Sequence, residues 1–147
     1  MRNTILKATF AAATLALAGQ LLAGGFLLVL GNPDASPEAR RLNAVLTVQA
    51  AGCHDPATAT LSATAIGVVN GRRREIPLNV QRLSSPGMFA LAQQWPSEGR
   101  WVIKLVGRNG EQFTNSLVRA EPAGPDRLHG QASMREFTAA EVDALLQ

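Results

Sequence analysis

The chain has 147 residues, enough for one domain beside its N-terminal segment, and carries a formal net charge of +3. Without Arg2 and Lys7, which precede the first apolar segment, the fourteen Lys and Arg become twelve against eleven Asp and Glu, a net charge of +1. A nearly neutral domain lacks the extended positive field of a nucleic-acid-binding protein, so we expect no nucleic-acid partner.

Residues 1–31 have the pattern of an export signal: Arg2 and Lys7 are followed by an uncharged run from Ala8 to Pro33. This run is longer than the roughly 20 residues that span a bilayer, so it is either a removable signal peptide or an N-terminal membrane anchor. We expect an exported domain that is periplasmic, secreted or anchored in the inner membrane. Any membrane contact would involve only residues 1–31.

Residues 32–42 are polar, contain two prolines and predict a linker or a short helical turn. Ser36 would be the N-cap of that turn and Pro37 its first helical residue, where a missing amide costs nothing.

Residues 43–134 show the alternation of apolar and polar side chains that is typical of half-buried β-strands. Strands are predicted over 44–50 and 57–69, and Asn70-Gly71 predicts a tight type I′ turn after the second. The third strand contains Pro77, which has no amide for a hydrogen-bond ladder, so we place it at a sheet edge.

The pattern in residues 86–108 predicts two paired antiparallel strands joined by a loop over 96–99. We expect this hairpin to form the centre of the core. The first arm has alternate apolar residues at Phe89, Leu91 and Trp95, and the second has them at Trp101, Ile103 and Leu105.

The remaining chain predicts two more strands and a helix. A sixth strand carries Phe113, Leu117 and Val118, and residues 128–134 predict a short edge strand. Residues 135–147 predict a short helix, because Thr138 and Glu141 have the spacing of a capping box. The predicted fold is all-β, an antiparallel immunoglobulin-like β-sandwich of six to seven strands, with an N-terminal apolar leader helix and this C-terminal helix.

Adjacent Cys53 and His54 are the candidate metal ligands. Cys53 is the only cysteine, which excludes an internal disulfide and a Cys-x-x-Cys metal site. Thiolate and imidazole suit copper, and His129 is the third ligand of the predicted site. Other soft side chains outside the leader are Met88 and Met134. The alternative is a turn in which Cys53 packs inward and Asp55-Pro56 sets the bend.

Two further features allow a binding or a structural interpretation. The run Arg72-Arg73-Arg74 would meet phosphate, lipid headgroups or an acidic partner, or it only keeps a hairpin soluble and protects a sheet edge. Trp95 and Trp101 would stack on a sugar or anchor the core. Because the sequence contains no nucleophile elbow, phosphate-binding loop or metalloprotease motif, we expect a protein that is not an enzyme.

The leader, the small sandwich and the pattern Pro86-Gly87-x-Phe89 followed by Trp95 and Gly99-x-Trp101-x-Ile103-x-Leu105 resemble the exported domains of the YtkA/FixH type. That resemblance implies an accessory role in copper handling or oxidase assembly, with an unknown protein partner in the periplasm or at the membrane. No metal-binding motif of that family can be matched residue by residue in this chain, so the resemblance assigns no site residue. The sequence therefore predicts an accessory binding module, for copper through Cys53 and His54, or a protein-interaction domain without a small ligand.

Overall fold

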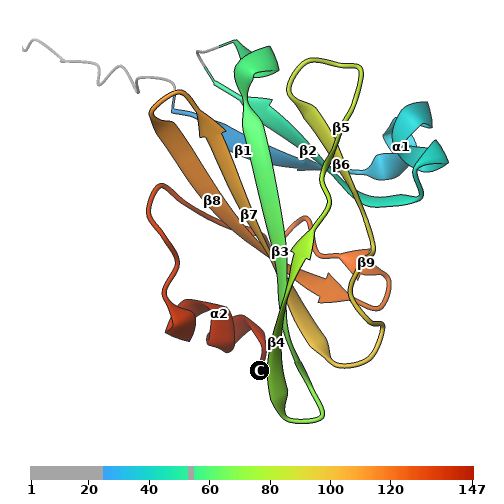
Figure 1. The fold of residues 1–147 in the computed structure, drawn as a ribbon, viewed down its shortest axis with the longest axis vertical. Helices are drawn as coiled ribbons and strands as arrows, with labels where there is room; N and C mark the ends of the chain where they lie inside the picture. The colour runs from blue at the N-terminus through green and yellow to red at the C-terminus, as the bar shows by residue number, and fades with distance from the viewer. Residues whose placement is uncertain (1–24, 53–54) are drawn as a thin grey trace, which may run out of the picture.

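The computed structural model of the protein describes residues 25–52 and 55–147. Two antiparallel sheets enclose the main core between their inner faces (Figure 1). The smaller sheet contains, in spatial order, β1 (Leu27–Gly31), β2 (Ala44–Ala51), β6 (Met88–Ala92) and β5 (Gln81–Arg82). The larger contains β10 (Gln131–Ser133), β8 (Gln112–Glu121), β7 (Arg100–Asn109), β3 (Thr60–Val69) and β4 (Arg72–Leu78), and β9 (Gly124–Pro125) pairs with β8. The all-β prediction is confirmed; the strands not predicted are β1, β5 and β9.

The predicted central hairpin over 86–108 is wrong. β6 pairs with β2 and β5 in the smaller sheet, whereas β7 pairs with β3 and β8 in the larger one. Alternation identifies which face of a strand is buried, not which strand lies beside it. Phe89 and Leu91 on β6 face the same core as Ile103 and Leu105 on β7, so both arms show the same pattern from opposite sheets.

The domain also begins earlier than predicted. The boundary after Gly31 placed β1 in the leader, but β1 pairs with β2 over its whole length, from Leu27 opposite Ala51 to Gly31 opposite Thr47. Leu28 and Leu30 pack against the main core, which explains why this apolar stretch belongs to the fold. The rest of the predicted leader lies outside the described residues and stays a prediction.

Local turn signals predicted their structures well. Asn70 and Gly71 have φ of 50° and 74°, as a type I′ turn requires, and they join β3 to β4. β4, with Pro77, is an edge strand as predicted. The second strand starts at Thr60 rather than at residue 57, because Asp55 caps a 3-10 helix, η2 (Pro56–Thr58).

The predicted linker is a packed part of the domain. It contains a 3-10 helix, η1 (Pro33–Ala35), and a helix, α1 (Pro37–Arg41). Ser36 is the predicted N-cap, since its hydroxyl accepts a hydrogen bond of 3.2 Å from the Ala39 amide. Ala39 is buried against Leu83 and Ala90, so α1 covers part of the outer face of the smaller sheet.

The C-terminal helix α2 (Ala139–Leu145) covers part of the outer face of the larger sheet (Figure 1). Its capping box is confirmed: the Thr138 hydroxyl accepts from the Glu141 amide, and the Glu141 carboxylate accepts from the Thr138 amide. A buried cluster of Ile66, Val102, Leu117, Val142 and Leu146 joins the helix to the sheet. No helix among the described residues is long and apolar enough to cross a membrane.

Candidate functional site

Of the three predicted metal ligands, only His129 is among the described residues. Its ring is 81% exposed, and its Nδ1 lies 2.8 Å from Oδ2 of Asp126. The hydrogen bond from His129 lowers the pKa of Asp126. Cys53 and His54 lie outside the described residues. Within residues 25–52 and 55–147, no group of three His, Cys, Asp or Glu side chains could hold a metal ion.

The chain on both sides of Cys53 and His54 is held at one end of the sandwich. Gly52 packs closely on the N-terminal segment, since a Cβ there would stand 3.2 Å from the Gly25 carbonyl oxygen. On the other side, the carbonyl oxygen of Asp55 accepts a hydrogen bond of 2.8 Å from the Thr58 hydroxyl and one of 3.2 Å from Asn109 Nδ2.

Met134 lies near this end of the sandwich. Its Cε stands 3.7 Å from the position of a Cβ on Gly25, the residue that contacts Gly52, and its side chain is 67% exposed. His129 precedes β10 and Met134 follows it. The structure therefore brings a thioether toward the chain that leads to Cys53.

Both tryptophans are core residues, which confirms their structural interpretation. Trp95 and Trp101 are 7% and 3% exposed, and Trp101 Nε1 donates a 2.8 Å hydrogen bond to the Glu98 carbonyl oxygen. The sugar-stacking alternative required an exposed tryptophan on one face, and neither side chain offers one.

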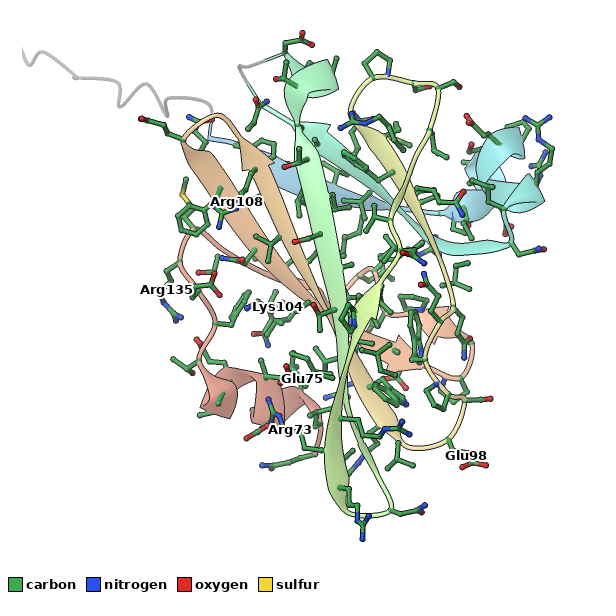
Figure 2. All side chains as sticks on the ribbon, in the orientation of Figure 1. Arg73, Glu75, Glu98, Lys104, Arg108 and Arg135 are labelled. Atoms are coloured by element: carbon green, nitrogen blue, oxygen red, sulfur yellow. The ribbon has the colours of Figure 1, made fainter. Side chains whose placement is uncertain are left out.

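The arginine run lies on the edge strand β4. Arg73 contacts the carboxylates of Glu75 and Asp143, so it ties the hairpin to α2 (Figure 2). Arg72 and Arg74 are exposed and line a surface hollow of about 490 Å³. Charged side chains along an edge strand protect it from pairing with another chain, and Pro77 adds to that protection.

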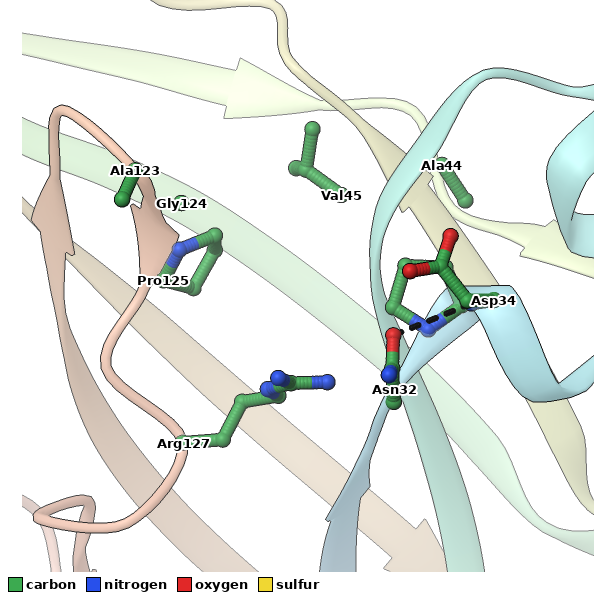
Figure 3. A pocket seen from close by; sticks show the side chains of 9 residues that line it. Asn32, Asp34, Ala44, Val45, Ala123, Gly124, Pro125 and Arg127 are labelled. Atoms are coloured by element: carbon green, nitrogen blue, oxygen red, sulfur yellow. Dashed lines mark hydrogen bonds between the residues drawn. The ribbon is translucent and has the colours of Figure 1, made fainter.

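A shallow pocket of about 290 Å³ opens between β2 and the β8–β9 turn. Figure 3 shows Arg127 extending into it toward Asn32, whose side-chain oxygen accepts a 3.0 Å hydrogen bond from the Asp34 amide. Asp34 also lines the pocket, so one guanidinium and one carboxylate face the same space. This lining suits a small polar molecule.

The exposed large apolar side chains among the described residues belong to β1 and to the residues that precede and follow β10. They are Leu27 (47% exposed), Val29 (48%), Leu128 (90%) and Met134 (67%). Among the described strands, β1 is one of the two edge strands of the smaller sheet and β10 one of the two edge strands of the larger sheet. Gly130 and Leu30 are in contact, since a Cβ on Gly130 would stand 2.9 Å from Leu30 Cδ1. We call Leu27, Val29, Leu128 and Met134 the edge patch.

Sequence reasoning missed Leu27 and Val29 of the edge patch because it assigned β1 to the leader. Burial alternates along Leu27–Gly31, because Leu28 and Leu30 face the core while Leu27 and Val29 face outward. In a run where every residue is apolar, that alternation is invisible.

Comparison of the chain with protein-family models, with curated proteins and with solved structures finds no match in any of the three.

Proposed function

We propose that this protein is a non-enzymatic accessory binding module, exported to the periplasm or tethered at the outer face of the membrane, whose ligand is another polypeptide. The observation that carries the proposal is that β1, which has no strand on its second side within residues 25–52 and 55–147, exposes apolar side chains. An immunoglobulin-like classification and the YtkA/FixH-type resemblance are compatible with this role and belong to the same proposal.

The contrast between the edge strands β4 and β1 supports a role for β1 in binding a polypeptide. β4 has Arg72, Arg73, Arg74 and Glu75 along its length, which disfavours pairing with another chain. β1 has the sequence Leu-Leu-Val-Leu-Gly, with neither charge nor proline. An edge of this kind is a template for a further strand, so the chain protects one edge and leaves the other available.

The surface around β1 favours an extended, apolar segment as ligand. A groove of about 320 Å³ runs beside the strand, and its lining consists of Leu28, Val29, Leu30, Ser116, Arg127, Gly130, Gln131 and Ala132. A strand added to β1 would pair with the amides and carbonyls that have no strand partner in the described part of the chain, and alternate side chains would enter this groove.

Site-specific photo-cross-linking in cells tests the proposal. The photoreactive residue p-benzoylphenylalanine replaces Val29 in the full chain, and in a matched control it replaces Glu98, which is exposed on a loop away from β1 (Figure 2). We expect a discrete adduct from position 29 that disappears when Leu27→Lys is added and the fold, checked by thermal unfolding, is kept. Equal labelling from both positions would refute the proposal.

Copper handling is the second candidate function, and the position of Met134 favours it. An exposed methionine is uncommon, and thioether, thiolate and imidazole together suit copper(I). If Cys53, His54 and Met134 bind copper(I), Met134→Leu weakens binding, while His129→Ala leaves it unchanged. A competition titration against a copper(I) chelator measures both variants beside a Cys53→Ala, His54→Ala chain. Binding that survives in the double variant would exclude this site.

A further inference from the structure

We propose that the pocket between β2 and the β8–β9 turn, which we call the Arg127 pocket, is a binding site for a small zwitterion of the α-amino acid type. In this site Arg127 binds the carboxylate of the ligand and Asp34 binds its ammonium group. The apolar walls of the pocket contact a short aliphatic side chain. The site goes beyond the polypeptide ligand proposed above and does not depend on it.

The guanidinium of Arg127 is the group that binds the anion. Arg127 is half-buried, and within residues 25–52 and 55–147 its side chain forms no hydrogen bond or ion pair. The carboxylate of the neighbouring Asp126 is turned to His129 instead, whose ring and amide both hydrogen-bond to it. A partly desolvated guanidinium without an acceptor is costly, and a carboxylate offers the two oxygens that its planar fork binds.

Hydrogen bonds fix both sides of the Arg127 pocket. On one side, the Asp126 amide donates a 2.8 Å hydrogen bond to the Arg119 carbonyl oxygen, which holds the chain next to Arg127. On the other, Asn32 Oδ1 accepts from the Asp34 amide, while Nδ2 has no acceptor in the described part of the chain. Figure 3 shows the Asn32 amide and the Arg127 guanidinium facing the same space. Asn32 Nδ2 is therefore a second donor for the same carboxylate.

Asp34 provides the opposite charge. It is exposed at the rim of the pocket, and its carboxylate accepts no hydrogen bond from the described residues, since Arg40 donates to its backbone carbonyl oxygen instead. Asp34 and Arg127 line the same pocket without forming an ion pair with each other. A simple anion would be repelled by Asp34 and a simple cation by Arg127, so a ligand that carries both charges fits best.

The size and the walls of the pocket limit the ligand. Its volume of about 290 Å³ lies at the lower end of the roughly 300–1,000 Å³ that ligand pockets occupy. Val45 and Pro125 form apolar walls, and both are held in place, because Val45 packs against the main core and Pro125 is buried. We therefore expect an amino acid with a short, uncharged side chain, of which alanine is the simplest chiral example.

NMR titration of the full chain at neutral pH tests the proposal with matched probes. The probes are alanine, propionate, which lacks the ammonium group, and ethylamine, which lacks the carboxylate. Alanine should bind about three- to fivefold more tightly than propionate, because an exposed ion pair with Asp34 contributes about that much. Ethylamine should bind most weakly, because it gains nothing from Arg127.

Single substitutions assign the two charges. Arg127→Gln should weaken binding of alanine and of propionate by about tenfold. Asp34→Asn should remove the preference for alanine and leave propionate bound at least as well as before. Arg72→Gln, at an exposed arginine outside the pocket, is the matched control and should change neither affinity. All three variants should keep the thermal unfolding of the parent, because none of these side chains forms a hydrogen bond or ion pair with the described residues.

Three results would overturn the proposal. They are no binding of alanine by the parent chain, equal affinities of the parent for alanine and propionate, and alanine binding that is unchanged in Arg127→Gln.

Discussion

The substitution Gly67→Ala tests the packing of the main core at a close contact between β3 and β7. Gly67 lies opposite Trp101, and a Cβ at position 67 would stand 2.3 Å from Trp101 Cε3 and 2.8 Å from the Arg100 carbonyl oxygen. The indole has little freedom to move, because it is buried and its Nε1 donates to the Glu98 carbonyl oxygen.

Overpacking of this kind typically costs about 1–3 kcal/mol. Replacing a glycine by alanine also reduces the entropy of the unfolded chain, which stabilises a protein by about 0.4–1 kcal/mol where the backbone allows it. The two effects oppose each other, and the clash is the larger. We therefore expect Gly67→Ala to lower the free energy of unfolding by about 1–2 kcal/mol.

Chemical denaturation followed by tryptophan fluorescence measures this change, since both tryptophans are in the core. Gly25→Ala is the matched control, because the nearest atom to its added Cβ is Met134 Cε at 3.7 Å, an ordinary van der Waals contact. The control should be as stable as the parent chain or slightly more stable. A Gly67→Ala chain as stable as the control would refute the reasoning.

Three further predictions concern the C-terminal segment. Thr138→Ala removes the N-cap of α2 and should cost about 1 kcal/mol in thermal unfolding, while Thr138→Ser should cost little; equal losses would contradict the capping role. Asn115→Ala removes the 2.8 Å hydrogen bond from Asn115 Nδ2 to the Arg135 carbonyl oxygen, and should increase amide exchange over residues 135–138 while leaving β7 protected. The hydrogen bonds from Arg135 lower the pKa of Glu141 to about 2, below its ordinary 4.5, so the unfolded chain binds the proton more tightly. The stabilisation from Glu141 is therefore complete above pH 4.5 and is lost as the pH falls toward 2, and Glu141→Gln should remove this dependence from acid-unfolding curves.

Local signals in the sequence predicted local structure correctly, because each has a short-range physical cause. Asn70-Gly71 accepts positive φ, Ser36 satisfies a free helix amide, and Thr138 with Glu141 satisfies two. The pairing of the two strands within residues 86–108 has no such short-range cause. An alternating strand has the same pattern in either sheet of a sandwich, so only the three-dimensional arrangement assigns β6 and β7 to different sheets.

In the candidate sites, too, residue type predicts some features and only the three-dimensional fold determines the others. Residue type alone identified the thiol and imidazole of Cys53 and His54 as possible ligands, but no pattern indicated that Met134 would lie near Gly25. That proximity depends on β10 returning beside β1, a contact between residues more than a hundred positions apart in the chain. The edge patch was hidden for a related reason, since composition does not distinguish an apolar export segment from an apolar strand.

The outward side chains of β1 have two possible explanations, and these make different predictions. If β1 served only to complete the core, Leu27 and Val29 could be polar, because the core-facing residues of the strand are Leu28 and Leu30. Their apolar character therefore serves either export, as part of the uncharged run that begins at Ala8, or a partner. The double substitution Leu27→Thr, Val29→Thr keeps β-propensity and adds no charge. We expect it to leave export unchanged, measured as the fraction of the domain outside the cytoplasm, and to abolish capture of a polypeptide partner by chemical cross-linking. Loss of export with intact partner capture would assign these side chains to translocation instead.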